Sequence, residues 1–330
     1  MLSPLLVAVL VSAYIFEFIN GFHDTANAIA TTVYTRALPV RVAILMSATM
    51  NFIGALTSES VAMTIANGIV SVNLELYVVL AALVGAITWD LFTWWQGIPS
   101  SSSHALIGSL IGATVVFSGS TEPVLWEGVL KKVVIPLFTS PLIGLVLGYC
   151  FMRLVFEIFA DWTPKRANGL FHRLQVASSA FMAYSHGNND AQKTMGIITL
   201  ALITSGEVAA GSGVPLWVKV SCATCMALGT SIGGQRIMKT VGKGMTKLEP
   251  VLGCVAELSS AIAIETMTAL GAPVSTTQVI NTAIMGAGSA RSAKKVRWGM
   301  AGSIVRAWFT TLPVTMLLGG LCALIIGQFV

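Results

Sequence analysis

The stretch NGFHDTANA, residues 20–28, interrupts what would otherwise be one long apolar segment. Residues 2–19 before it are nearly uncharged, and another apolar run, 28–33, follows directly. A glycine and an aspartate therefore fall where a membrane helix would be crossing the bilayer. An ionisable group at that depth costs about 2.5–3.5 kcal/mol, so it marks a candidate functional site. The stretch predicts a membrane helix that is broken at the glycine.

A related stretch, HGNNDAQK at residues 186–193, interrupts a second apolar region near the middle of the chain. Two discontinuous membrane helices at corresponding places are typical of the binding site of a secondary transporter. The pair therefore predicts a transport site to which both helices contribute.

The composition excludes a soluble globular protein. Of the 330 residues, 55% are hydrophobic and 10% are charged, whereas soluble domains carry about 25% charged residues. Apolar runs of about 20 residues recur along the chain, which predicts an all-α polytopic membrane protein. The net charge of +5 is spread over loops, so no nucleic-acid partner is expected. One CxxC, Cys222 and Cys225, has no second pair, so neither zinc nor any other cofactor is expected.

The chain reads as two related halves. Asp24 superposes on Asp190 with an offset of 166, and the proline-serine tips at 99–101 and 273–275 superpose with an offset of 174. The shared order of these matches favours an internal repeat. We expect a first repeat at 1–160, a short cytoplasmic linker at 161–173 and a second repeat at 174–330.

Charged loop residues orient the halves. The loop after the opening helix is basic, while the matching loop at 204–215 contains only an acidic residue. Conversely, 57–75 is acidic and 236–247 is basic. Because basic loops face the cytoplasm, corresponding loops lie on opposite sides of the membrane. The repeats are therefore predicted to be inverted.

Two segments, 76–117 and 251–288, are predicted to be re-entrant hairpins with tips near Pro99 and Pro273. The remaining crossings are expected at 2–33, 42–56, 133–156, 174–203, 216–232 and 298–329. In this map Lys131 and Lys132 lie outside, against the charge rule, and 57–73 has no assigned place beyond a short interfacial helix.

Both hairpin tips carry a proline followed by hydroxyl side chains. Proline and Ser or Thr ahead of an apolar run predict a capped helix start, which offers unpaired N–H groups to an anion. Two such starts meeting from opposite faces suit a tetrahedral oxyanion. The candidate anion-binding hydroxyls are Ser101, Ser102, Ser103, Ser275, Thr276 and Thr277.

The interrupted helices supply hard oxygen ligands of the kind that an alkali cation prefers. Two carboxylates beside an anion would repel it unless cations intervene, so the site predicts co-transport of an anion with Na⁺. The candidate Na⁺ ligands are Asn20, Asp24, Asn188, Asn189 and Asp190, with unwound backbone carbonyls beside them.

Other polar residues in apolar runs have two interpretations each. Lys193 stands where Asn27 stands in the first half. Both are candidate anion ligands, although Lys193 also suits pairing with Asp190 at i,i+3. His23 and His186 suit either proton coupling or helix packing. Glu257 and Glu265 suit either coupling or pairing with a loop arginine.

Other functions and a purely structural role compete with coupled transport. Hydroxyl clusters often only tighten helix packing. Ser101 or Ser102 with His104 and Asp24 could be imagined as an intramembrane serine hydrolase, but no GxSxG elbow is present. Two hairpins meeting at the midplane also occur in an anion channel, although paired aspartates fit a coupled carrier better.

Four motifs then match one family. NGFHDTANA (20–28), PSSSSHALIG (99–108), SHGNNDAQK (185–193) and GAPVSTTQ (271–278) closely resemble the PiT family of inorganic phosphate transporters. The resemblance covers essentially the whole chain. It implies a Na⁺- or H⁺-coupled phosphate symporter of the plasma membrane, built from inverted repeats and working by alternating access as a homodimer.

The family's signature motifs fall on 21–27 and 187–193, and its hairpin hydroxyls fall on 101–103 and 275–277. Eukaryotic members have glutamate where Asn51 stands, and many members have histidine where Gln278 stands. The second departure removes a titratable group and favours Na⁺ over H⁺. H⁺-coupled phosphate, metal-phosphate or sulfate transport remains the alternative within this fold.

Overall fold

The computed structural model describes residues 3–71, 74–98, 100–232 and 248–329, without the side chains of 25–27, 295, 300, 301, 303, 304, 307 and 308. Regular structure there is helical, apart from one isolated bridge between Val70 and Val124. The helices are α1 (Pro4–Tyr34), α2 (Val40–Ala55), α3 (Ser60–Gly68), α4 (Leu76–Gln96), α5 (Ser102–Ser118), α6 (Trp126–Val129), a π-helix (Leu130–Val134), α7 (Ile135–Ile158), α8 (Pro164–Thr204), α9 (Leu216–Ile232), α11 (Pro250–Ala269), α12 (Thr276–Ser292), a 3₁₀ turn (Ala293–Lys295) and α13 (Trp298–Ile326).

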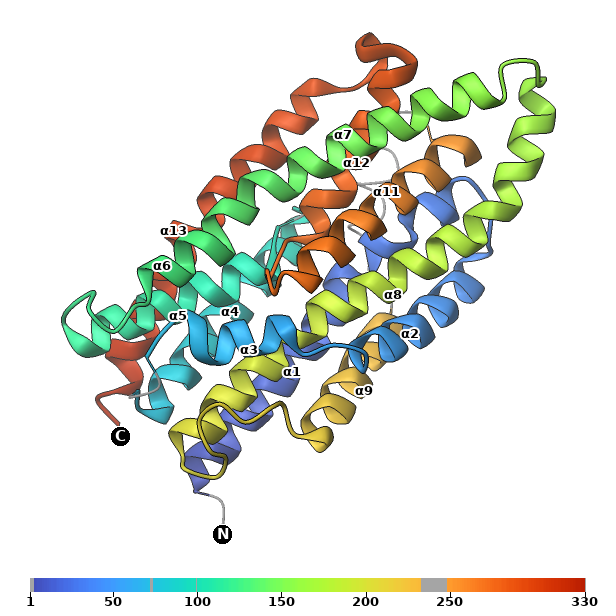
Figure 1. Ribbon diagram of the computed structural model, residues 1–330. Coiled ribbons are helices and arrows are strands. Elements are labelled where there is room, and N and C mark those ends of the chain that lie inside the picture. The colour runs from blue at the N-terminus through green and yellow to red at the C-terminus, as the bar shows by residue number, and fades with distance from the viewer. Residues whose placement is uncertain (1–2, 72–73, 99, 233–247, 330) are drawn as a thin grey trace.

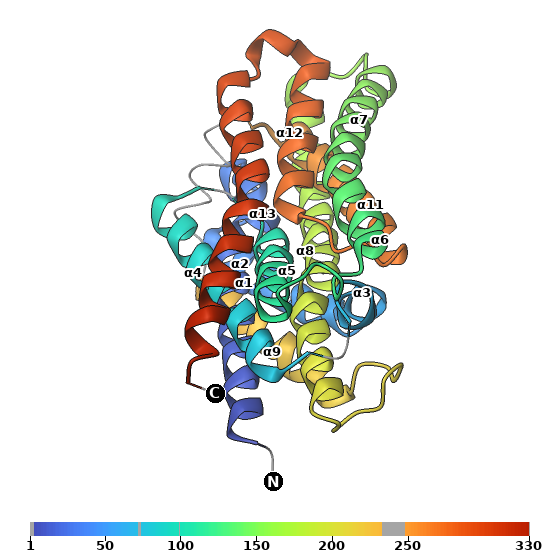
Figure 2. The same ribbon diagram turned by 90° about the vertical axis from the view of Figure 1, so that its left-hand side faces the viewer.

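The long helices form one elongated bundle, and both termini lie at the same end of it (Figures 1 and 2). Within the described residues, five helical stretches are long and apolar enough to cross a membrane. α2 and α3 would make a sixth as a broken span, since they are bent by 62°. These lengths match the all-α membrane architecture that the composition predicts.

The predicted breaks in α1 and α8 are wrong, because both helices run continuously through their motifs. A Cβ on Gly21 would lie 2.5 Å from the Met226 carbonyl oxygen, and one on Gly187 would lie 2.3 Å from that of Asn51. The glycines therefore let α1 approach α9, and α8 approach α2, at backbone contact. A helical glycine costs only about 1 kcal/mol relative to alanine. The unwound carbonyls expected as cation ligands are consequently absent from these two helices.

Each of the two segments predicted as a re-entrant hairpin contains a pair of helices joined by a short connection, α4–α5 and α11–α12. Gly97 (φ 69°) ends α4 and Gly271 (φ 67°) follows α11, so a left-handed residue turns the chain at each tip. The α11–α12 turn lies in the interior of the bundle (Figure 1), and residues 271–288 are buried throughout. In the first hairpin, residues 100–114 are buried. Pro99 lies outside the described residues, and re-entry to one membrane face stays a prediction.

The unplaced segment 57–73 contains the short helix α3, which packs against α8. The Gln192 side-chain oxygen accepts hydrogen bonds from the backbone N–H groups of Val61 (2.8 Å) and Ala62 (3.2 Å). Glu59, just before α3, pairs with Lys219 at 2.7 Å. α3 is thus held at its N-terminus by both α8 and α9.

The structure shows the partners of Lys131 and Lys132 and the position of the predicted linker. Lys131 pairs with Glu127 at 2.6 Å, and Lys132 Nζ donates to the Leu270 carbonyl at the end of α11 (2.6 Å). Most of the predicted linker 161–173 belongs to α8, which begins at Pro164. The basic loop expected at 236–247 lies outside the described residues.

Candidate functional site

The two hairpin tips meet inside the bundle. Ser103 Oγ of the first hairpin donates to the Val274 carbonyl oxygen of the second at 2.9 Å. Ser101 caps α5 by accepting from the His104 N–H (3.3 Å), and Ser275 caps α12 by accepting from the Gln278 N–H (3.4 Å). The first hydroxyl of each tip therefore fixes its helix start, and both N-termini are directed to the same region.

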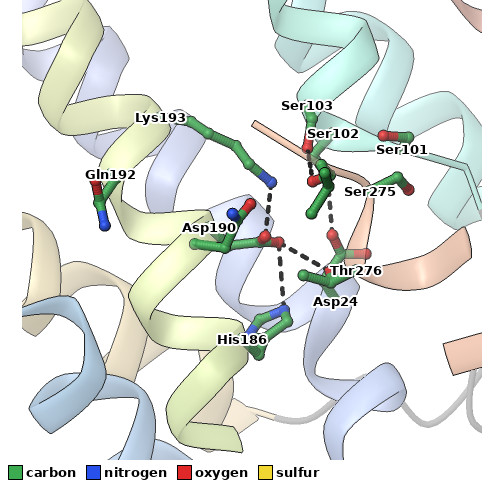
Figure 3. Close-up of polar contacts among 12 residues, drawn as sticks. Asp24, Ser101, Ser102, Ser103, His186, Asp190, Gln192, Lys193, Ser275 and Thr276 are labelled. Carbon is green, nitrogen blue, oxygen red and sulfur yellow. Dashed lines mark hydrogen bonds and ion pairs between the residues drawn. The ribbon is translucent and has the colours of Figure 1, made fainter. Parts of the chain in front are cut away.

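The next hydroxyls reach the two aspartates that the sequence singles out (Figure 3). Ser102 Oγ and Thr277 Oγ1 donate to Asp24 at 3.4 and 3.3 Å. Thr276 Oγ1 donates to Asp190 at 3.2 Å. α1, α8 and both hairpin tips thus converge at one buried polar centre. The distances are at the long end of the normal range, so these hydrogen bonds are weak.

The contacts follow the numbering offsets of the halves. Asp24–Ser102 corresponds to Asp190–Thr276, since 24 + 166 = 190 and 102 + 174 = 276. In each case the first-turn hydroxyl of a hairpin reaches the aspartate of its own half.

The surroundings of the two carboxylates differ. Lys193 Nζ lies 2.6 Å from Asp190 Oδ1, and His186 Nε2 lies 3.4 Å from Asp190 Oδ2. Asp24 instead lies 2.8 Å from His23 Nδ1. Asp24, His186 and Asp190 each offer one donor atom, and these three atoms lie within 4.8 Å of one another. The group could hold a metal ion.

Some of the remaining predicted cation ligands already form hydrogen bonds with other side chains of the protein. Asn188 Nδ2 donates to Glu265 (3.0 Å), while its oxygen accepts from Gln192 (3.2 Å). The oxygens of Asn20 and Asn189 are buried without a hydrogen-bond partner in the described part of the chain. The Asn27 side chain lies outside the described residues.

Glu257 lies apart from the centre, where the C-terminal end of α1 meets α8 and α11. Its carboxylate accepts hydrogen bonds from four side chains, namely Thr31, Thr32, Gln175 and Ser178. Glu265 accepts from Asn188. For these two glutamates the contacts in the described residues are with neutral groups, so the predicted loop-arginine pairing is not seen there.

Two buried carboxylates were missed from the sequence. Glu17 accepts a hydrogen bond from Thr194 across α1 and α8. Asp90 of α4 is fully buried near His23, Asp24 and Ser102. Both interrupt apolar runs, so the rule that selected Asp24 would also have selected them.

The family comparison decides what kind of protein carries this centre. Residues 20–319 match the model of the phosphate transporter family. The chain belongs to that family. A Bacillus subtilis (strain 168) protein is 46% identical over 98% of both chains. A Mycobacterium bovis protein is 47% identical over 96% of this chain and 76% of the relative. Each relative is named a probable low-affinity inorganic phosphate transporter.

A solved structure has the same fold. "The sodium-dependent phosphate transporter" superposes with a TM-score of 0.92 at 24% identity, covering 99% of this chain and 100% of the other. Membership in the phosphate transporter family, together with the membrane-length helices, makes the chain a multi-pass membrane protein and a transporter rather than an enzyme. The serine hydrolase alternative is therefore excluded.

Proposed function

We propose that the protein is a secondary active symporter that imports inorganic phosphate together with Na⁺. The observation that carries the proposal is the meeting of two hydroxyl-bearing helix starts with two buried aspartates from α1 and α8. The names of the relatives support phosphate as the substrate, and the name of the structural neighbour supports Na⁺ as the coupled ion.

Phosphate would bind at the hairpin tips. Ser102, Thr276 and Thr277 now donate weak hydrogen bonds to the aspartates. A phosphate oxygen is an equally good acceptor and can take over these donors. The N-terminal dipoles of α5 and α12 add a favourable field for the anion. Ser103 already bridges the two tips, so it couples the hairpins to each other.

Cations would bind between α1 and α8. Asp24 and Asp190 provide the hard oxygens, and bound Na⁺ removes the repulsion that the aspartates would exert on phosphate. The His186 nitrogen in the same group favours a second candidate. Imidazole together with carboxylates suits a divalent transition metal better than an alkali ion. Transport of a metal–phosphate complex is therefore the alternative that the geometry supports.

We propose alternating access as the transport cycle. The α4–α5 and α11–α12 hairpins would rock about the fixed α1–α8 centre, exposing it to one side at a time. The matched contacts of the two halves support this symmetry, because each aspartate is held by the tip of its own repeat. A plasma-membrane location and a homodimer complete the proposal.

Uptake of radiolabelled phosphate into proteoliposomes tests the proposal. An inward Na⁺ gradient should drive saturable accumulation, while a proton gradient alone should not. Accumulation driven only by protons, or only with added Zn²⁺ or Mn²⁺, would instead establish one of the alternatives. Non-saturable flux would identify a channel. Sulfate as a competitor tests anion selectivity in the same assay.

A further inference from the structure

The two halves of the site differ in fixed charge. In the second half, the ammonium of Lys193 lies 2.6 Å from Asp190, and the two side chains are 1% and 0% exposed. Such a buried pair is jointly neutral, and either partner alone would be costly at this depth. Asp190 therefore carries its own counter-ion, supplied by the residue one helical turn further along α8.

The first half lacks this counter-ion. The position that corresponds to Lys193 is Asn27, since 193 − 166 = 27, and its side chain is neutral. In the described residues, Asp24 contacts the His23 ring and the hydroxyls of Ser102 and Thr277. These groups offer hydrogen bonds, whereas the second half offers a permanent positive charge.

Asp90 increases the imbalance. It is completely buried on α4, near His23, Asp24 and Ser102. A buried carboxylate is unfavourable in its charged form unless its surroundings compensate the charge. The first half thus brings two acidic groups to the centre, and in the described residues no lysine or arginine of that half forms an ion pair with them.

We propose that Lys193 is a tethered cation. Its ammonium takes, at Asp190, the place that an exchangeable Na⁺ takes at Asp24. The inference rests on the proposed Na⁺–phosphate symport and sharpens it. A Na⁺ at Asp190 would share one carboxylate with the ammonium, and the two like charges would repel each other. This chain therefore couples one Na⁺ to each phosphate, where a site with asparagine at both positions would couple two.

The inference is distinct from a role of Lys193 as a phosphate ligand alone. A ligand that contacts only phosphate would change the Km for phosphate and leave the number of cations unchanged. A tethered cation controls that number. Counting the ions transported per phosphate therefore separates the two roles. A purely structural ion pair would also leave this number unchanged.

Lys193→Asn, which copies the first half, provides the test, with Lys193→Arg as the matched control that keeps the charge. Proteoliposomes are exposed to external ²²Na⁺ and ³²P-phosphate, and the ratio of the two initial uptake rates is measured. We expect one Na⁺ per phosphate for the wild type and for Lys193→Arg. For Lys193→Asn we expect a ratio of two, with uptake changing from first to second order in Na⁺.

If Lys193→Asn no longer transports, equilibrium binding of Na⁺ still tests the proposal. Purified protein in detergent is titrated with ²²Na⁺, and the variant should bind one more Na⁺ per chain than the wild type. An unchanged ratio or an unchanged number of bound ions in the variant overturns the tethered cation while leaving symport intact. A wild type whose uptake does not respond to Na⁺ contradicts the proposed function itself.

Discussion

The two halves of the site use the same scaffold with different charges. Each half places an aspartate of a long helix against the first-turn hydroxyl of its own hairpin, Asp24 with Ser102 and Asp190 with Thr276. The second half also neutralises its aspartate with Lys193, whereas the first half surrounds Asp24 with hydrogen-bonding groups. Under the proposed function, the shared placement of aspartate and hydroxyl defines where ligands bind, while one side chain decides whether a cation must come from outside.

Removing the charge of the first aspartate should have the largest effect. Asp24→Asn should abolish Na⁺-driven phosphate uptake, a loss of at least about 100-fold, because the amide cannot neutralise a cation. Purified protein should still be folded, since asparagine fills the same volume. Uptake assays with size-exclusion profiles provide the measurement.

The control for this variant is Asp161→Asn, on the exposed turn before α8, which should transport normally. Near-normal uptake by Asp24→Asn would remove this residue from the cation site and would make the second half the place where cations bind.

The same substitution in the second half should act on stability as well as on transport. Asp190→Asn leaves the Lys193 ammonium buried without its partner, which should destabilise the fold by about 3–5 kcal/mol. Asp24→Asn should not show this loss. Denaturant unfolding of both variants in detergent measures the difference.

The double variant Asp190→Asn/Lys193→Met removes both charges and should regain most of the stability. If the single and double variants have the same free energy of unfolding, the ion pair does not stabilise the fold. The difference between the halves would then affect transport only.

Glycine substitutions test the continuity of α1 and α8. Gly21→Ala and Gly187→Ala should each cost about 1–3 kcal/mol, because the added methyl groups meet backbone carbonyls at 2.5 and 2.3 Å. Gly169→Ala in α8 is the matched control, since a Cβ there meets nothing within 4 Å. It should be neutral or stabilising by up to about 1 kcal/mol. A gain in stability at position 21 or 187 would contradict the close helix contacts.

The hydroxyl substitutions should have the smallest effects. Ser102→Ala and Thr276→Ala should each raise the Km for phosphate by about 5–10-fold, the loss expected for one hydrogen bond of about 1–1.4 kcal/mol. Equal effects would support matched anion contacts in the two halves. If the Km changes in only one variant, phosphate contacts a single hairpin. If the Km is unchanged in both variants, phosphate binds elsewhere.

Much of the fold follows from local patterns. The all-helical membrane class and the two helix pairs α4–α5 and α11–α12 follow from apolar run length and from a proline ahead of hydroxyl residues. Helix breaking at Gly21 was wrong because glycine in an apolar run has two uses, and only the neighbouring helix decides between a break and a close contact. Asp90 was passed over although its sequence context resembles that of Asp24.

The sequence by itself determined that this is a polytopic membrane protein and which motifs form its buried polar centre, and it predicted that Asp24 and Asp190 hold equivalent positions. These conclusions depend on composition, spacing and chemical type, which are properties of the chain alone. Only the tertiary structure decided that α1 and α8 are continuous, that the two tips touch, that Lys193 pairs with Asp190, and that Asp90 lies buried near Asp24. Those facts depend on distances between helices that are far apart in sequence, and no local pattern encodes them.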